Sequence, residues 1–149
     1  TRAPYHVAHL STAGAAAIVA EAKQRGLPVT AEVTPHHLLL TDEDVLGYKT
    51  ACKVNSPLRE ASDIQALRRA LAAGVFDVIA TDHAPHAEAD KRCEFSDARP
   101  GMIGLETCFP LLLELVTRGE LPLQRLLSAL TVGPARIIGL RARPLRRSY

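Results

Sequence analysis

The sequence predicts an α/β fold, specifically the C-terminal part of a TIM-like (β/α)8 barrel that is incomplete in this chain. Segments typical of strands alternate with segments typical of helices, as in βα units built on a parallel sheet. Polar side chains follow each predicted strand, and in such folds the chemistry lies at the carboxyl ends of the strands. The chain has 149 residues, whereas a complete barrel takes about 250. We therefore expect residues 1–140 to form a partial barrel.

The composition is that of an ordinary globular protein. Hydrophobic residues make up 47% and charged residues 23% of the chain, which argues against disorder. A net charge of +2 argues against a dedicated partner of nucleic acid or of a membrane surface. The three cysteines show no CxxC spacing, so a reducing, cytoplasmic environment is expected rather than a disulfide framework. No apolar run reaches the length of a membrane span.

Three segments have the composition of strands. Residues 5–10 form the first, and residues 28–34, rich in β-branched side chains, form the second. Residues 76–81 form the third, an apolar run that leads directly into Thr-Asp-His. The sheet is expected to be parallel because helical segments separate these strands.

The helical segments show apolar residues at helical spacing. Residues 12–25 are rich in alanine and stop before Gly26. In the segment 62–73, Ser62 is the predicted N-cap, and three apolar residues share one face, namely Ile64, Leu67 and Leu71. Further helices are predicted at 105–118, 123–130 and 134–138. The sequence predicts irregular structure over 35–54, with one helical turn at 42–46, and a polar loop over 82–104.

His9 is the candidate metal ligand of the first strand. His6 and His9 are three residues apart on a predicted strand, so their side chains are expected on opposite faces. His9 is nearer the carboxyl end and is therefore preferred as the ligand. For His6 we expect a structural, hydrogen-bonded role.

Asp82, within the stretch IATDHAPH, is the strongest candidate of the chain for metal binding and catalysis. A carboxylate at the mouth of a barrel can bind a metal ion and accept a proton from the attacking water. The alternative is a helix N-cap or a salt bridge. His86 lies in a loop, where it could donate a hydrogen bond to an anionic substrate. His83 is a candidate for holding Asp82 in orientation.

The remaining polar candidates carry weaker expectations. Asn55 lies between Lys53 and Arg59, where its amide could pair with a substrate amide, or the loop could simply be solvated. Glu32, within its strand, could support a metal site or bind an accessory ion. His36 and His37 are expected to be structural, and the cysteines structural or incidental.

Five stretches of this sequence together resemble the dihydroorotases of the amidohydrolase superfamily, in particular their bacterial long-chain class. As a set these motifs are specific, and they extend over most of the chain. The stretches are HVAHLSTAGA (6–15), GLPVTAEVTPHHLLLTDED (26–44), KVNSPLR (53–59), IATDHAPH (79–86) and GMIGLET (101–107).

The resemblance implies zinc-dependent, reversible hydrolysis of the dihydroorotate ring amide to N-carbamoyl-L-aspartate, a step of pyrimidine synthesis. It implies that His9 and Asp82 bind zinc, with Asp82 also the catalytic acid/base. It implies substrate contacts from side chains and backbone at Asn55, His86, Pro100 and Gly101. Glu32 is similar to a position that binds an accessory zinc in some members. One or two zinc ions are implied per complete site.

The chain also departs from the family pattern. Ser56 stands where proline is usual, and the Arg-rich tail at 141–149 is atypical. The family's His-x-His pair, bridging carboxylate and further histidine would precede Thr1, so we expect this chain alone to be inactive. Two alternatives stay open: an allantoinase or hydantoinase, and a non-catalytic partner of aspartate transcarbamoylase. A homo-oligomer is also possible on this resemblance.

Overall fold

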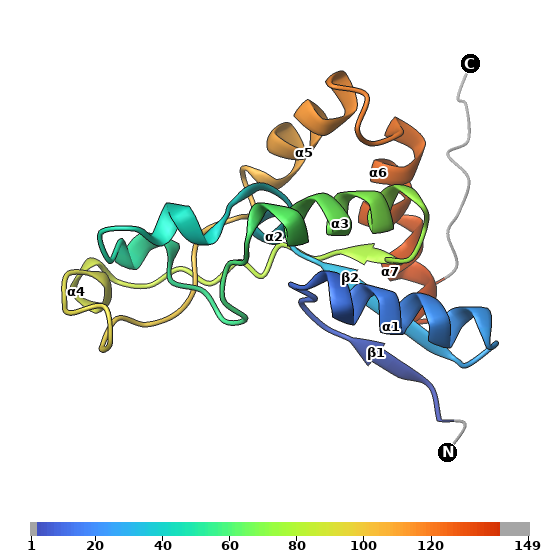
Figure 1. Cartoon of the computed structure of the whole chain (residues 1–149), viewed down its shortest axis with the longest axis horizontal. Coiled ribbons are helices and arrows are strands. Elements are labelled where there is room, and N and C mark those ends of the chain that lie inside the picture. Colours follow the sequence, from blue (N-terminus) through green and yellow to red (C-terminus); the bar gives the residue numbers. More distant parts are fainter. Residues whose placement is uncertain (1–2, 141–149) are drawn as a thin grey trace.

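Three parallel strands form the sheet on which the fold is built. The computed structural model describes residues 3–140, and the predicted tail at 141–149 lies outside them. The strands are β1 (Tyr5–Val7), β2 (Val29–Val33) and β3 (Val78–Ile79), in the order β1-β2-β3. Both pairings are parallel. The predicted α/β class with a parallel sheet is confirmed (Figure 1).

Helices follow each strand and pack together beside the sheet. Helices α1 and α3 lie side by side, and α6 contacts β3 (Figure 1). The α-helices are α1 (Ala13–Gln24), α2 (Pro35–Leu39), α3 (Ala61–Ala72), α4 (Glu88–Lys91), α5 (Cys108–Thr117), α6 (Leu123–Leu130) and α7 (Val132–Ile137). Two short 3-10 helices, η1 (Asp42–Val45) and η2 (Thr50–Cys52), interrupt the connection between α2 and α3. No helix of residues 3–140 is both long and apolar enough to cross a membrane.

The two faces of β2 have different surroundings. Ala31 and Val33 are fully buried and belong to the hydrophobic core under the helices. Thr30 and Glu32 alternate with them and therefore project from the other face of the sheet. His6 is the register partner of Thr30 and contacts both of these side chains. Polar groups thus gather on the face of the sheet that lies opposite the core.

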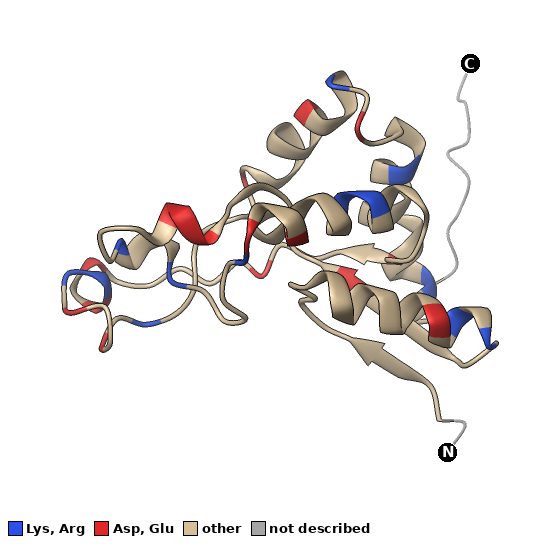
Figure 2. Ribbon diagram, in the orientation of Figure 1, with Lys and Arg blue, Asp and Glu red and all other residues tan. Residues whose placement is uncertain are grey.

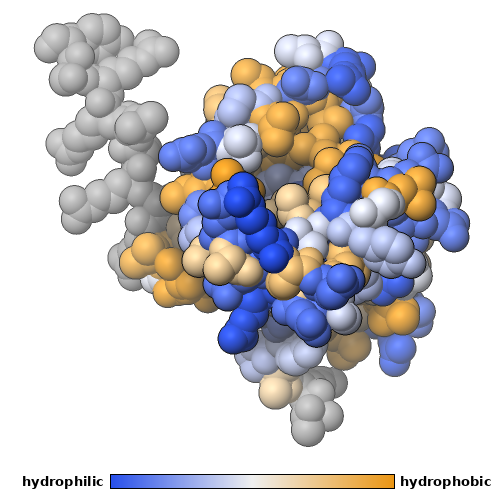
Figure 3. Space-filling model, turned by 90° about the vertical axis from the view of Figure 1, so that its left-hand side faces the viewer, coloured by the Kyte–Doolittle hydropathy of each residue, from blue (hydrophilic) through white to orange (hydrophobic). Residues whose placement is uncertain are grey.

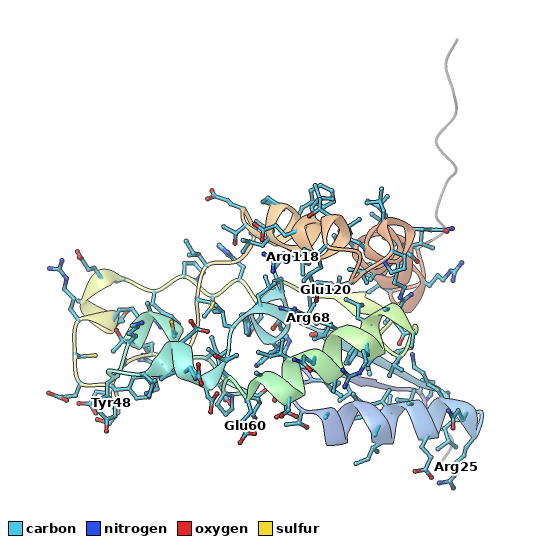
Figure 4. All side chains as sticks on the ribbon, turned by 45° about the horizontal axis from the view of Figure 1, so that its top comes forward. Arg25, Tyr48, Glu60, Arg68, Arg118 and Glu120 are labelled. Atoms are coloured by element: carbon cyan, nitrogen blue, oxygen red, sulfur yellow. The ribbon has the colours of Figure 1, made fainter. Side chains whose placement is uncertain are left out.

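The core is made mainly of aliphatic side chains from the helices, β2 and β3, together with the fully buried Phe76. The predicted inner face of α3 is confirmed, because Ile64, Leu67 and Leu71 are buried. Burying one such side chain stabilises a fold by about 1.5–3 kcal/mol. Polar pairs close the edges of this core: Arg68 Nη1 lies 2.7 Å from Glu120 Oε2 (Figure 4).

Several predicted boundaries are wrong. The N-cap of α3 is Glu60 rather than Ser62, and α5 begins at Cys108 rather than at 105. β1 and β3 are shorter than predicted. The segment predicted to be irregular contains α2, and the loop predicted at 82–104 contains α4.

The helix α2 has a clear local cause. The Thr34 hydroxyl accepts a hydrogen bond from the backbone N–H of His37 at 3.2 Å, and proline occupies the first helical position. Proline is favoured there because its missing N–H would have no partner within the helix. The short helix turns both of its histidines into the protein interior.

The loops after β2 and β3 form a lobe at one end of the molecule, which we call the loop lobe (residues 41–59 and 83–104). It contains α4 and extends away from the other α-helices, on the left of Figure 1. It carries charges of both signs (Figure 2). Viewed from that end, the surface mixes hydrophilic and hydrophobic residues (Figure 3). The lobe contains four of the predicted site residues: Asn55, His86, Pro100 and Gly101.

Candidate metal and substrate site

His9 and Asp82 come together at the carboxyl ends of β1 and β3. His9 Nε2 lies 3.7 Å from Asp82 Oδ1, and both side chains are partly exposed. Both residues also have left-handed backbone conformations, with φ of 51° and 48°. Such a conformation costs a non-glycine residue roughly 1–3 kcal/mol and is concentrated at functional sites. The two residues that the sequence singled out for metal chemistry are therefore adjacent.

The distance between these two atoms suits a shared zinc ion. Bonds from zinc to imidazole nitrogen and to carboxylate oxygen are each about 2.1 Å, so one ion can reach two atoms 3.7 Å apart. A catalytic zinc has three protein ligands. Within residues 3–140, no group of three or more His, Cys, Asp and Glu side chains is placed to hold a metal. The described residues thus fit part of a zinc site.

Glu32 lies between His6, in β1, and His9, which follows β1. Its carboxylate lies 3.0 Å from His6 Nε2 and 2.7 Å from His9 Nδ1. The second contact is close but poorly aligned for a hydrogen bond, which leaves His9 Nδ1 buried without an aligned partner. The prediction that His6 and His9 point to opposite faces is wrong. Because β1 ends at Val7 and His9 has a positive φ, the strand alternation does not extend to His9.

His6 keeps the structural role predicted for it. Its second ring nitrogen lies 2.8 Å from the Thr30 hydroxyl, so both nitrogens are occupied by neighbours on β2. A histidine held on both sides fixes the position of Glu32. Glu32 in turn lies against the imidazole of His9 and restricts its position.

His86, Pro100 and Gly101 form one contact group in the loop lobe. His86 Nε2 donates a hydrogen bond to the Pro100 carbonyl at 2.9 Å. Gly101 has a φ of 138°, and a Cβ atom there would lie 2.8 Å from Ala84 Cβ and 2.9 Å from His86 Nε2. Only glycine fits, so this backbone can lie directly against His86. The residue pattern alone had not identified Pro100 or Gly101; the family resemblance had.

Asn55 and Pro100 line a common cleft of about 960 Å³, together with Lys53 and Arg99. The cleft runs between the two halves of the loop lobe, and Asn55 is exposed in it. Neither His9 nor Asp82 is among its lining residues. The described residues thus group the predicted site into a metal part, at the strand ends, and a substrate part, in the loop lobe.

His37 and Ser56 connect these two parts. His37 Nε2 donates to the Ser56 carbonyl at 2.9 Å, and the Thr34 hydroxyl lies 2.7 Å from its Nδ1. The Ser56 hydroxyl in turn donates to the His9 carbonyl at 3.0 Å. The loop that carries Asn55 is thereby joined to the backbone of His9. The only local pattern that points to this link is the Thr34–Pro35 helix cap.

Burial controls the protonation of both histidines of α2. Desolvation, and then the nearby His37 and His9, lower the pKa of His36 to about 3. Desolvation also lowers the pKa of His37, although the hydrogen bond to the Ser56 carbonyl opposes this. Both imidazoles are therefore neutral near pH 7, as structural histidines of a core should be.

His83 has a different role from the one predicted. Its Nδ1 accepts hydrogen bonds from the backbone N–H groups of Gly104 and Leu105, both at 3.1 Å. The backbone of the neighbouring Ala84 also donates to the Met102 carbonyl. His83 thus fastens the segment after Gly101 to the end of β3, rather than holding the carboxylate of Asp82.

Known proteins are similar to this chain in both sequence and fold. It is 59% identical over 144 residues to a dihydroorotase of Anaeromyxobacter dehalogenans, which covers 95% of this chain and 33% of that protein. It is 58% identical over 141 residues to a dihydroorotase of Carboxydothermus hydrogenoformans, covering 94% of this chain and 33% of that protein. The chain therefore spans about a third of the length of these curated relatives.

Solved structures are also similar to this chain in fold. An L-hydantoinase (dihydropyrimidinase) from Arthrobacter aurescens superposes with a TM-score of 0.85 at 31% identity, over 90% of this chain and 31% of that one. Dihydroorotase from Saccharomyces cerevisiae, solved with 5-fluoroorotic acid, gives a TM-score of 0.82 at 19% identity, over 91% of this chain and 38% of that one, which supports the fold alone. The predicted fold, part of a TIM-like barrel, is confirmed. The sequence profile of the Amidohydrolase family matches residues 1–143, and the chain belongs to this family.

Proposed function

We propose that this chain provides part of the active site of a zinc-dependent cyclic amide hydrolase that interconverts dihydroorotate and N-carbamoyl-L-aspartate in pyrimidine synthesis. The observation that carries the proposal is the pairing of His9 and Asp82 at 3.7 Å. It occurs at the carboxyl ends of parallel strands, in a chain 59% identical to a dihydroorotase. Ring opening of dihydroorotate is hydrolysis of a cyclic amide, and the resemblance of the motifs to dihydroorotases implies that zinc takes part in it.

His9 and Asp82 would hold the metal, and Asp82 would also carry the proton. A bound zinc ion acts as a Lewis acid and lowers the pKa of a coordinated water to about 7. Asp82 would accept a proton from the attacking water and return it to the ring nitrogen that leaves. Glu32 would keep the His9 imidazole oriented through its contact with Nδ1.

The loop lobe would bind the substrate. Asn55 offers both a donor and an acceptor to the ring amide. The Nε2 N–H of His86, which donates to the Pro100 carbonyl in this structure, would turn to the substrate carboxylate. The backbone at Pro100 and Gly101 would cover the ring, since it already lies against His86.

A hydantoinase or allantoinase is the second candidate activity. The structural similarity to an L-hydantoinase at 31% identity favours this class. The identity to dihydroorotases, 48–59% among the most similar relatives, favours dihydroorotate more strongly. A non-catalytic partner of aspartate transcarbamoylase would have no need of His9, Asp82 and His86, all of which are present. We expect the protein to act in the cytoplasm, and its free cysteines support a reducing compartment.

The test compares three cyclic amides as substrates of the complete gene product that contains this chain. Dihydroorotate, hydantoin and allantoin are assayed at matched concentrations, with zinc and with a chelator. We expect dihydroorotate to be turned over at least about tenfold faster than the other two, as one tenfold step is 1.4 kcal/mol of discrimination. Faster turnover of hydantoin or allantoin would contradict the proposal.

A matched pair of variants tests whether Asp82 is required for turnover. Asp82→Asn should abolish turnover, because an amide neither accepts the proton nor binds zinc as a carboxylate does. Asp90→Asn makes the same change in α4, at an exposed position, and should leave turnover unchanged. The isolated 149-residue chain should be inactive, and measured turnover by it would contradict the view that it holds only part of the site.

A further inference from the structure

We propose that Lys91 is a positioning residue that binds the two substrate-contacting segments of the loop lobe to each other. The proposal rests on the proposed function, because it takes Asn55 and the Pro100–Gly101 backbone as substrate contacts. Lys91 lies at the end of α4 and makes no contact with the metal part of the site. Neither the motifs nor the matched relatives' names assign it a role.

The ammonium group of Lys91 is fully occupied by backbone carbonyls. Its Nζ donates to Gly101 O at 2.6 Å, Arg99 O at 2.8 Å and Thr50 O at 3.0 Å. A lysine has three N–H donors, and here each of them has an acceptor. Two acceptors belong to the segment around Pro100, and the third belongs to the segment that leads to Asn55.

Further hydrogen bonds connect the same two segments. The Thr50 hydroxyl donates to the Lys91 carbonyl at 2.6 Å. Thr50 and Lys91 are therefore joined by two hydrogen bonds, one donated by each side chain to the other residue's carbonyl. The Gly101 N–H donates to the Lys53 carbonyl at 2.8 Å. Lys53 Nζ donates to the Phe95 and Ser96 carbonyls at 2.6 Å and 2.8 Å. Gly101 is thus held from both sides, by Lys91 at its carbonyl and by Lys53 at its N–H.

Charge and burial show that this position is not an ordinary surface lysine. Burial, and then the nearby ammonium of Lys53, lower the pKa of Lys91, while Cys52 and Cys93 act in the opposite direction. The two ammonium groups donate to separate sets of backbone carbonyls. Removing the ammonium of Lys91 would leave three carbonyls to find water or to move apart.

A methionine substitution tests the positioning role, with the same substitution at Lys49 as its control. Lys91→Met keeps the length of the side chain and removes its donors. Lys49 is an exposed residue of the same lobe, and no hydrogen bond or ion pair of its side chain occurs among residues 3–140. Both variants are made in the complete gene product and assayed with dihydroorotate.

We expect Lys91→Met to raise KM about tenfold and to change kcat less than about threefold. Loss of contacts made equally in the ground and transition states acts on KM, and misplacement by about 1 Å can cost up to 10²-fold. Lys91→Arg should give a smaller rise in KM, about threefold, because a planar guanidinium cannot direct three N–H groups as an ammonium does. Lys49→Met should match the parent protein, and zinc content should be equal in all four proteins.

Unchanged KM in Lys91→Met, or an equal rise in Lys49→Met, would overturn the proposal. If Lys91→Met is insoluble, Lys91→Arg takes its place in the assay, and a KM equal to that of the parent protein would then overturn the proposal.

Hydrogen exchange of residues 95–101 tests the positioning role of Lys91 independently of the proposed activity. If the parent protein does not act on dihydroorotate, the proposed function fails, and exchange alone then decides the role of Lys91. At least tenfold faster exchange in Lys91→Met than in Lys49→Met supports the link between segments, and equal exchange overturns it.

Discussion

His9 Nε2 and Asp82 Oδ1 lie 3.7 Å apart although their strands do not pair with each other. β2 separates β1 from β3, and both residues follow their strands with a positive φ. Left-handed conformations of non-glycine residues are concentrated at functional sites, and here two of them carry the imidazole and the carboxylate that lie together.

Zinc affinity should depend on both of these residues. We expect Asp82→Asn and His9→Gln each to weaken zinc binding to the complete gene product at least about a hundredfold, since even residues that only orient ligands are worth 10–100-fold. Zinc is measured by competition with a chromophoric chelator. His86→Gln is the control, because His86 faces Pro100 rather than the metal part, and it should keep full zinc affinity. Equal affinity in all three variants would remove this site from consideration.

Glu32 should influence zinc binding without touching the metal. Its carboxylate lies between His6 and His9, so Glu32→Gln should weaken zinc binding by roughly 10–100-fold through loss of imidazole orientation. Thr30→Val removes a neighbouring contact, to His6 alone, and should have a much smaller effect. The same chelator competition measures both. An effect of Thr30→Val as large as that of Glu32→Gln would show that the whole face matters rather than this carboxylate.

The sequence predicted the strongly patterned parts of the fold correctly. Leu123–Leu130 is helical with the predicted bounds, and the spacing of Ile64, Leu67 and Leu71 identified the buried face of α3. The α2 helix was missed because it is only five residues long, too short for a periodic pattern. Its Thr-Pro cap was the one local signal available.

The candidate site was predicted in part for a similar reason. A carboxylate and an imidazole directly after apolar runs are visible in the sequence, and the structure places His9 and Asp82 together. The alternation argument for His6 failed because it assumed that the strand continues to His9. The roles of His83, Ser56 and Lys91 depend on contacts with backbone groups far along the chain, which no local pattern reports.

Stability should fall in mild acid because His36 is buried in its neutral form. Its pKa is about 3 in the folded protein against 6.5 for an unperturbed histidine. The unfolded state therefore binds more protons between these values, and the free energy of unfolding decreases as pH falls below 6.5. The slope from one such group is at most about 1.4 kcal/mol per pH unit.

Replacing His36 tests this dependence. His36→Gln should flatten the fall of the thermal midpoint between pH 7 and pH 5, whatever it does to the midpoint at pH 7. His86→Gln makes the same change at an exposed histidine and is the control, because it keeps His36. A pH dependence unaltered by His36→Gln would assign acid sensitivity to other groups.

Gly133 should not tolerate a side chain, in contrast to Gly14. A Cβ atom at Gly133 would lie 2.0 Å from the backbone oxygen of Asp77, so α7 would have to move away from the segment before β3. Asp77 is itself fixed, because its carboxylate accepts hydrogen bonds from Lys23 and from the Ala31 N–H. Overpacking of this kind costs about 1–3 kcal/mol. We therefore expect Gly133→Ala to lower the thermal midpoint of unfolding.

Gly14→Ala is the control. It places the same methyl group in α1, where nothing lies within 4 Å, and should stabilise the helix by up to about 1 kcal/mol. If both variants shifted the midpoint in the same direction, close packing of α7 against Asp77 would not be the cause.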